Sequence, residues 1–207
     1  MENTSKRLAE FYDKIYSENK DTFGTEPDPL VERVLDYLQT GDAIEFGSGE
    51  GRNSLFLASK GFRVKATDIS PVALSKIKER AREQNVSLET EIVDITRLEL
   101  SESYDLMIST FTLHHLAREQ ALVFLEKIKE HTRTRGFIIL TSFTKNGDFY
   151  RNNPKTDKFY LSENELRNLF SDLEVVAYLE KEGKAFAKKA DGSPMFNVFA
   201  GIVARKL

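Results

Sequence analysis

Short apolar runs alternate with stretches of helical periodicity along most of this 207-residue sequence. Four short runs, at residues 43–46, 62–67, 88–93 and 104–110, are predicted to be strands, and the last has the apolar density of a strand that is covered on both faces of a sheet. Between them, apolar residues recur at three- and four-residue intervals, the spacing of a helix that buries one face. The pattern predicts successive βα units, and therefore a mostly parallel sheet with helices on both faces.

Two helices are expected ahead of the first strand. The first is amphipathic and covers the apolar positions from Leu8 to Ile15. The second begins with Asp28 as its cap and Pro29 at its first position, and it ends at Gly41. The apolar stripe of this second helix is Val31, Val34, Leu35 and Leu38.

Capping residues also mark the two helices of the first βα units. One helix is expected from about Gly51 to Lys60, closed by Gly61. The next begins with Ser70 as its cap and Pro71 directly after it. Serine supplies a side-chain acceptor for the first turn, and proline has a φ that already suits a helix.

The βα pattern continues once more after the fourth strand. A helix around residues 122–128 leads through a turn at Gly136 to a fifth strand, residues 137–143. Ser162 and Glu165 have the spacing of a capping box, which predicts a short helix from that point.

The sequence ends in two strands in place of a further βα unit. Residues 173–180 and 195–204 are apolar runs joined across Asp191-Gly192, a hairpin turn signal. We therefore predict an α/β fold of the Rossmann-like, doubly wound type: a mostly parallel seven-stranded sheet with a C-terminal antiparallel hairpin and helices on both faces. The length suits one domain, with residues 28–207 as its core and 1–27 as a helical lid segment.

Composition and charge disfavour several classes of function. With 30 basic and 33 acidic residues the net charge is −3, so nucleic acid is not an expected partner. There is no cysteine, and His114, His115 and His131 lack the spacing and acidic neighbours of a metal site. No apolar leader and no run of about 18 apolar residues occurs. We expect a cytoplasmic monomer or homodimer that binds neither metal nor membrane.

Three glycines stand at alternate positions directly after the first strand: Gly47, Gly49 and Gly51. A phosphate-binding P-loop would need Lys-Ser or Lys-Thr after its last glycine, and neither follows here. A dinucleotide turn, G-x-G-x-x-G, would need glycine where Arg52 stands. Glycine permits positive φ and close approach of a ligand to the backbone, so the turn suits a flat, bulky ligand. The alternative is a turn that only closes a tight βα connection.

Acidic residues fall at the carboxyl ends of three neighbouring strands: Glu45, Asp68 and Asp94. Asp68 follows Gly49 by 19 positions, close to the offset of about 20 at which an acidic residue meets ribose hydroxyls in this architecture. Three carboxylates at one sheet edge disfavour a pyrophosphate and favour a ligand that carries positive charge. For Asp94, a polar strand end without a ligand is the alternative.

This combination of Glu45, alternate glycines and an acidic end to the next strand resembles the S-adenosylmethionine (SAM) site of class I SAM-dependent methyltransferases. The resemblance covers about residues 28–207 and includes YDLMISTFTLHHL, residues 104–116. Within that superfamily, residues 51–70 and 183–206 resemble the tellurite-resistance methyltransferases, which methylate small chalcogen species.

The resemblance implies that SAM is the cofactor and S-adenosylhomocysteine the product. Glu45 would meet the amino group, and Asp68 would hold the ribose. Asp94 and the backbone of Ile95 would meet the adenine, and Ser109 would offer its carbonyl to the ammonium group. The expected cofactor-binding residues are Glu45, Phe46, Gly47, Ser48, Gly49, Gly51, Arg52, Asn53, Asp68, Ile69, Asp94, Ile95 and Ser109.

The acceptor side departs from the tellurite-resistance pattern. Its His-Arg pair and a later arginine are replaced by Phe186, Ala187 and Pro194, which disfavours oxyanions and favours an apolar or aromatic substrate. The fourth strand is followed by Phe111 and not by the Pro-Pro segment of enzymes that methylate base amines. Phe111 and Phe186 are therefore candidate substrate residues for a small-molecule acceptor with an oxygen, sulfur, nitrogen or chalcogen nucleophile.

His114 and His115 are the candidate catalytic residues, because histidine titrates near neutrality and can serve as a general base. The alternative is that one histidine packs in the core and the other is solvated. Tyr12, Phe23 and Gly24 are candidates for a lid that excludes water from the reaction, and the alternative is a helix packed on the sheet edge.

The predicted function is a SAM-dependent methyltransferase that acts on a small molecule. Replacement of the His-Arg pair keeps a second hypothesis open, a SAM-binding regulatory protein without catalysis. A third, an NAD(P) oxidoreductase, is disfavoured by Arg52 in the glycine motif.

Overall fold

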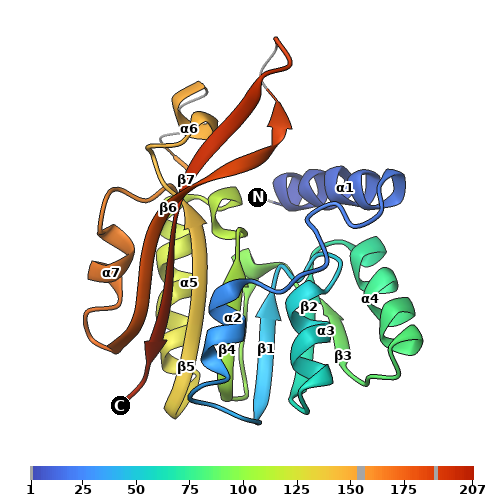
Figure 1. Ribbon diagram of the computed structural model, residues 1–207, viewed down its shortest axis with the longest axis vertical. Helices are drawn as coiled ribbons and strands as arrows, with labels where there is room; N and C mark the ends of the chain where they lie inside the picture. Colours follow the sequence, from blue (N-terminus) through green and yellow to red (C-terminus); the bar gives the residue numbers. More distant parts are fainter. Residues whose placement is uncertain (1, 153–156, 189–190) are drawn as a thin grey trace.

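The computed structural model describes residues 2–152, 157–188 and 191–207 and contains a seven-stranded sheet (Figure 1). The strands are β1 (Asp42–Phe46), β2 (Arg63–Asp68), β3 (Glu89–Ile92), β4 (Tyr104–Thr110), β5 (Thr132–Phe143), β6 (Glu174–Lys188) and β7 (Pro194–Arg205). Their order is β3-β2-β1-β4-β5-β7-β6, with β7 antiparallel to β5 and β6 and the other neighbours parallel. This confirms the predicted doubly wound, Rossmann-like sheet and its C-terminal hairpin.

Helices cover both faces of the sheet. The helices of the described residues are α1 (Glu2–Glu18), α2 (Pro29–Val34), α3 (Arg52–Ser59), α4 (Pro71–Glu83), α5 (Arg118–Glu130), α6 (Asp148–Asn152) and α7 (Glu165–Leu169). Helices α2, α3 and α4 pack on one face, and α5 and α7 pack on the other. Helix α1 lies across the carboxyl ends of the parallel strands, and the β6–β7 hairpin extends past the sheet beside it (Figure 1).

Strand β1 shows how two apolar layers hold the sheet in place. Ala43 packs among the side chains of α2 and α3, whereas Ile44 and Phe46 pack in the layer that contains α5. The rings of Phe46 and Phe124 meet edge to face, with 5.1 Å between their centroids. Full burial of a phenylalanine contributes about 1.5 to 3 kcal/mol, so both layers fix the strand whose end carries the glycine turn.

Both predicted helix caps next to that turn are present. Asp28 Oδ1 accepts a hydrogen bond from the Leu30 N–H at 2.9 Å, at the start of α2. Ser70 Oγ accepts from the Ala73 N–H at 3.1 Å, at the start of α4. Each cap satisfies an N–H group that the first turn of a helix leaves without a partner.

Two predicted boundaries differ from the structure. Helix α2 ends at Val34 and not at Gly41, because the backbone N–H groups of residues 35–37 donate to carbonyls three, and not four, positions back. Gly136 is not a turn before the fifth strand but lies inside β5. The strand extends past it because Gly136 pairs with the C-terminal segment, where its carbonyl accepts from the Lys206 N–H.

The segment after β5 also differs from the prediction. Helix α7 begins at Glu165 with Asn164, φ 57°, as its cap. Half of the expected capping box forms, since the Glu165 carboxylate accepts from the Ser162 N–H at 2.7 Å, but the Ser162 hydroxyl accepts from Lys145 instead of capping the helix. Helix α6 was not predicted.

A matched pair of substitutions tests the packing of the glycine turn. Gly51 and Gly61 have similar positive φ values, 86° and 91°, but an added Cβ would lie 2.8 Å from Ile77 at Gly51 and would meet nothing within 4 Å at Gly61. We expect Gly61→Ala to lower the free energy of unfolding by about 1 to 2 kcal/mol, and Gly51→Ala to lower it by roughly a further 1 to 3 kcal/mol. Urea denaturation measures both free energies of unfolding. Equal losses in the two variants would contradict the close contact between Gly51 and Ile77.

Candidate functional site

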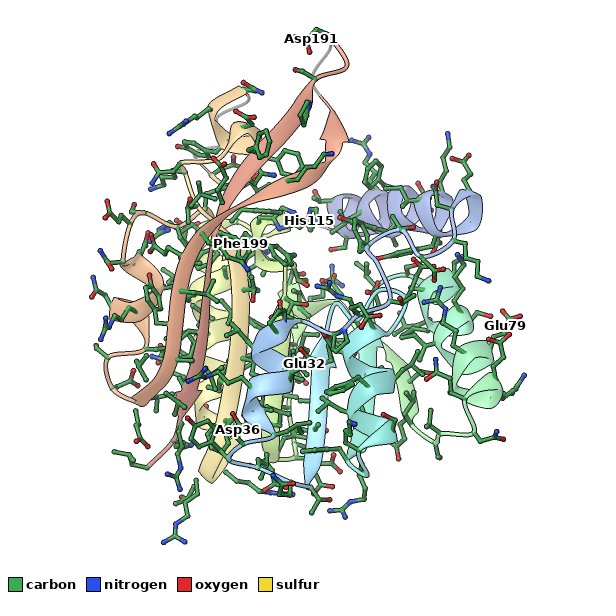
Figure 2. The ribbon with its side chains drawn as sticks, viewed as in Figure 1. Glu32, Asp36, Glu79, His115, Asp191 and Phe199 are labelled. Atoms are coloured by element: carbon green, nitrogen blue, oxygen red, sulfur yellow. The ribbon has the colours of Figure 1, made fainter. Side chains whose placement is uncertain are left out.

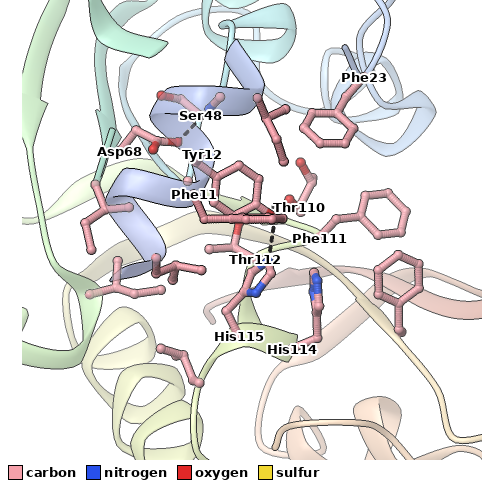
Figure 3. A pocket seen from close by; sticks show the side chains of 18 of the residues that line it. Phe11, Tyr12, Phe23, Ser48, Asp68, Thr110, Phe111, Thr112, His114 and His115 are labelled. Carbon is pink, nitrogen blue, oxygen red and sulfur yellow. Dashed lines mark hydrogen bonds between the residues drawn. The ribbon is translucent and has the colours of Figure 1, made fainter. Parts of the chain in front are cut away.

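A cavity of about 690 Å³ lies at the carboxyl ends of the parallel strands, beneath α1 (Figure 3). The turn after β1 and the ends of β2 and β3 border one side of it. The segment after β4, the end of β5, helix α6 and the β6–β7 hairpin border the other side. The strand order reverses between β1 and β4, so the cavity is at the position where open α/β sheets bind ligands.

Close neighbours explain two of the three glycines in the turn. Gly47 has φ 70°, and a Cβ there would lie 2.3 Å from Thr112 Oγ1. Gly49 has φ 54°, and a Cβ there would lie 2.9 Å from the Tyr16 hydroxyl. The turn therefore fits between α1 and the segment after β4 only because it has no side chains at these positions.

The Glu45 carboxylate is buried at the end of β1, with 1% of the residue exposed. It accepts hydrogen bonds from Asn53 Nδ2, at 2.7 Å, and from the Ser54 hydroxyl. Burial outweighs these bonds and raises the pKa of Glu45 to about 7. Asn53 Nδ2 also donates to Thr110 at 3.3 Å, and Asn53 Oδ1 accepts from the Asp28 N–H at 2.8 Å.

Two more carboxylates follow along the same edge. Asp68 accepts from the Gly49 N–H at 2.8 Å and from the Ser70 N–H at 2.9 Å, and burial raises its pKa. Asp94 accepts from the N–H and the hydroxyl of Thr96, at 2.9 and 2.7 Å. Burial alone would raise the pKa of Asp94, but hydrogen bonds from Thr96 and Ser5 hold it below its usual value. Glu45, Asp68 and Asp94 therefore line one side of the cavity together.

Helix α1 closes the cavity from above through its aromatic side chains. The Tyr12 hydroxyl lies 2.7 Å from His115 Nε2, a hydrogen bond that Figure 3 shows as a dashed line. The Tyr12 ring stacks on Tyr16 at 5.7 Å, and Tyr16 meets Phe23 edge to face at 6.2 Å. Burial, followed by the charge of Asp68, raises the pKa of Tyr12 to about 12.

The segment between α1 and α2 is held by Glu50, a residue that sequence reasoning missed. Its carboxylate, on a residue 5% exposed, accepts from the Thr22 N–H at 2.7 Å and from Lys76 and Arg80, both at 3.1 Å. Arg80 also pairs with Asp21. Although burial raises it, the pKa of Glu50 is held below its usual value by Lys76, Thr22 and Arg80. The sequence did contain a signal for this role, because Glu50 is an acidic residue between two glycines of the motif.

Aromatic rings form the opposite side of the cavity. Phe111, directly after β4, contacts the rings of Phe143 and Phe199 with centroid distances of 5.0 and 5.3 Å. His114 meets Phe143 at 4.8 Å, and Phe149 meets Phe143 at 5.4 Å. All five residues line the cavity. Sequence reasoning found Phe111 and His114 but missed the other three rings, which come from later strands and loops.

Most of the predicted site residues come together around this cavity. Those that line it are Tyr12, Phe23, Gly24, Glu45, Gly47, Ser48, Gly49, Arg52, Asn53, Asp68, Ile69, Asp94, Ile95, Phe111, His114 and His115. The side chain of Phe186 lies outside the described part of the structure. His131 caps α5 away from the cavity, with its ring on the Glu102 carbonyl at 3.0 Å.

Three expected cofactor residues do not line the cavity. The Phe46 ring is buried in the core, and Gly51 packs against Ile77 of α4. Ser109 lies one position inside β4, where it pairs with Leu140, so Thr110 borders the cavity in its place. The strand ends at Thr110 as predicted, so Ser109 is its penultimate residue and Thr110 is the one that borders the cavity.

Within the described ranges, no three histidine or acidic side chains gather closely enough to hold a metal ion, and no helix is long and apolar enough to cross a membrane.

Comparison with known proteins identifies the family. The family model described as "Tellurite resistance protein TehB" matches residues 8–203, nearly the whole chain. The chain belongs to the TehB family. Membership agrees with the resemblance that the glycine motif and the C-terminal segment indicated.

The TehB relatives are longer than this chain. A probable S-adenosyl-L-methionine-dependent methyltransferase TehB from Haemophilus influenzae is 29% identical over 163 residues, which are 79% of this chain and 56% of the relative. The crystal structure of TehB from Haemophilus influenzae has a TM-score of 0.80 and 25% identity, with 95% of this chain and 67% of that chain covered. This chain therefore spans a little over half the length of the curated relative.

More distant structures share the fold. The N-methyltransferase NodS from Bradyrhizobium japonicum, solved with S-adenosyl-L-homocysteine, has a TM-score of 0.71 at 16% identity, and the match covers 95% of this chain and 97% of NodS. At 16% identity, this likeness shows that NodS and this chain share a fold.

The raised pKa of Glu45 predicts a pH dependence of stability. The folded pKa, about 7, exceeds the usual value of 4.5. The folded state therefore binds this proton more tightly, and the stabilisation is complete below the usual pKa and is lost as the pH rises through about 7. Glu45→Gln keeps the shape without the titration, so its free energy of unfolding should fall less between about pH 5 and 8, by up to roughly 1.4 kcal/mol per pH unit. Urea denaturation of both proteins across this pH range measures the difference. If the free energies of unfolding of the parent chain and of Glu45→Gln changed in parallel with pH, the pKa of Glu45 would not be raised.

Proposed function

We propose that this protein is a SAM-dependent methyltransferase that transfers a methyl group to a small-molecule acceptor. The observation that carries the proposal is the row of carboxylates, Glu45, Asp68 and Asp94, around a glycine turn at the carboxyl ends of three adjacent parallel strands. The TehB relatives named as probable methyltransferases support it.

The chemistry of these residues fits SAM. Carboxylates attract a cation and accept from hydroxyl and amino groups, and SAM carries a sulfonium, an ammonium, a ribose diol and an adenine amine. Asp68 would hold the ribose, Asp94 with Ile95 the adenine, and Glu45 the ammonium, directly or through water. The Ser48 hydroxyl is buried with no hydrogen-bond partner among the described residues, and the Gly49 backbone leaves no room for a side chain. Both features suit a ligand held against this turn.

When bound, SAM supplies a methyl group on a positively charged sulfur, which passes to an acceptor lone pair while the electron pair of the breaking carbon–sulfur bond stays on sulfur. The protein has to align the two reactants, and alignment is worth up to about 7 to 11 kcal/mol. Tyr12 and Tyr16 of α1, with Phe23, cover the cavity and exclude water, which makes residues 1–27 the proposed lid.

His115 is the proposed group for any proton that the acceptor loses. The Tyr12 hydroxyl bonded to Nε2 fixes the orientation of its imidazole when α1 covers the cavity. His114 lies beside it, 3.9 Å between ring centroids, and contacts Phe143. Closure of the lid would therefore orient His115 and exclude water together.

Release of S-adenosylhomocysteine from SAM in the presence of small thiol, alcohol, amine and chalcogen acceptors tests the proposed activity. Mass spectrometry should detect a methylated acceptor in equal amount. Binding of SAM without product in any mixture would favour the alternative, a regulatory protein, and absence of SAM binding would contradict both.

Loss of the Asp68 carboxylate should weaken cofactor binding. Because Asp68→Ala removes the proposed contact with the ribose hydroxyls, the affinity for SAM should fall at least about tenfold, as hydrogen bonds to a charged group are worth about 1.5 to 3 kcal/mol. Calorimetric titration measures the affinity, and a thermal melt confirms that the variant is folded. Asp36→Ala is the matched control, since Asp36 is exposed at the opposite end of the sheet (Figure 2). Unchanged affinity in Asp68→Ala would refute the ribose contact.

A further inference from the structure

The side of the cavity opposite the carboxylates is an aromatic wall, made by Phe111, His114, Phe143, Phe149 and Phe199. Each of these residues is only partly buried, so its ring presents surface to the cavity. The rings meet in tilted and edge-to-face pairs with centroids 4.8 to 5.4 Å apart. Figure 2 shows Phe199 and His115 at the same end of the sheet, although they come from β7 and from the segment after β4.

Phe111 occupies a strained backbone position in this wall. Its φ is 55°, in the left-handed region, where residues other than glycine lose about 1 to 2 kcal/mol. Its N–H donates to the Thr141 carbonyl at 2.8 Å, which fixes the peptide in place. Such strain concentrates at functional sites. Glycine would adopt this φ without strain, so a phenylalanine at this position indicates that its ring is needed.

A buried hydrogen bond places a second ring of the wall. Asn197 of β7 is 2% exposed, and its Oδ1 accepts from the Phe149 N–H at 2.9 Å. A Cβ on Gly147 would lie 2.8 Å from Asn197, so the loop after β5 packs tightly on β7. Phe149 is therefore held by a rigid strand, which favours a wall of fixed shape.

Charge is distributed unequally between the two sides of the cavity. The carboxylates that line it, Glu45, Glu50, Asp68 and Asp94, all belong to the side formed by β1, β2 and β3. Among the described residues that line it from β4 onward, none is acidic and none is arginine; the cations are Lys158, whose ammonium group donates to the His115 carbonyl at 3.0 Å, and the exposed Lys184. A small oxyanion is bound best by several charged donors, arginine above all. The aromatic wall itself offers the faces and edges of rings, which favour flat apolar partners.

Phe111 and Phe199 also separate this cavity from a second one of about 190 Å³, which both rings line as well. Removal of either ring would join the two spaces. The rings therefore limit the depth of the main cavity and would set the position of a flat molecule bound in it.

We propose that the aromatic wall is the acceptor site and that it selects a small aromatic molecule over an inorganic oxyanion. The inference rests on the proposed methyl transfer and names its substrate class. For an aromatic thiol, the sulfur lone pair forms the new bond to the methyl carbon, the carbon–sulfur bond of the sulfonium breaks with its electron pair left on that sulfur, and the thiol proton passes to His115 or to solvent.

Thiophenol, cyclohexanethiol and tellurite are the probes. Calorimetric titration into the chain with S-adenosylhomocysteine measures binding without turnover, and release of S-adenosylhomocysteine from SAM measures transfer. Thiophenol should bind and react about tenfold better than cyclohexanethiol, which has similar size but no aromatic ring. Equal use of both thiols, preference for tellurite, or failure of thiophenol to bind would overturn the proposal.

Two substitutions in β7 test whether thiophenol binds at the aromatic wall. Phe199→Ala should weaken thiophenol binding about tenfold by removing one ring contact and the burial that goes with it. Phe196→Ala is the matched control, because Phe196 is 41% exposed on the same strand and does not line the cavity. Both variants should bind S-adenosylhomocysteine as the parent chain does. Loss of thiophenol binding in both variants, or in neither, would refute the wall as the acceptor site.

The same titrations separate the two proposals. If S-adenosylhomocysteine binds the parent chain and thiophenol does not, the acceptor proposal fails and the cofactor proposal stands. If S-adenosylhomocysteine does not bind, the proposed function fails.

Discussion

The buried amide of Asn53 is the contact on which the site depends most. Its oxygen accepts from the backbone of Asp28 at the start of α2, and its nitrogen donates to Glu45 and Thr110, at the ends of β1 and β4. These are the two strands between which the sheet order reverses. One fully buried side chain thus fixes the width of the opening in the sheet and the direction of the Glu45 carboxylate. An apolar residue there would leave several buried polar groups unpaired, at roughly 1 to 3 kcal/mol each.

Around that contact the cavity has two chemically different sides. Acidic strand ends face a side built from aromatic rings, and the glycine turn meets the segment after β4 where Gly47 packs against Thr112. This division matches a transfer between a cationic donor and an apolar acceptor. Helix α1 covers both sides of the cavity. Its Tyr12 contacts His115, and the segment after α1 is held next to α4 because Glu50 binds both Thr22 and the basic side chains of α4. Helix α1 therefore covers the cavity and holds His115 at the same time.

Local signals allowed much of the fold to be predicted. The caps at Asp28 and Ser70 and the strand at 104–110 depend on residues that are neighbours in the sequence, and all are present. The pairing of Tyr12 with His115, 103 positions apart, depends on where α1 settles, which no local pattern contains. Three rings of the aromatic wall were missed for the same reason, since Phe143, Phe149 and Phe199 come from β5, α6 and β7. Apolar density placed the end of β4 correctly at Thr110, but it does not show that Thr110, and not Ser109, borders the cavity.

The central claim is that the acidic and glycine-rich edge of this sheet binds a nucleoside carrying a sulfonium or thioether, and calorimetric titration of the purified chain tests it most directly. The account predicts saturable, micromolar binding of SAM and S-adenosylhomocysteine, on the order of −8 kcal/mol, and none of NAD, because the negative charge along this edge disfavours a pyrophosphate. Binding of NAD in preference to SAM, or binding of neither, would contradict it.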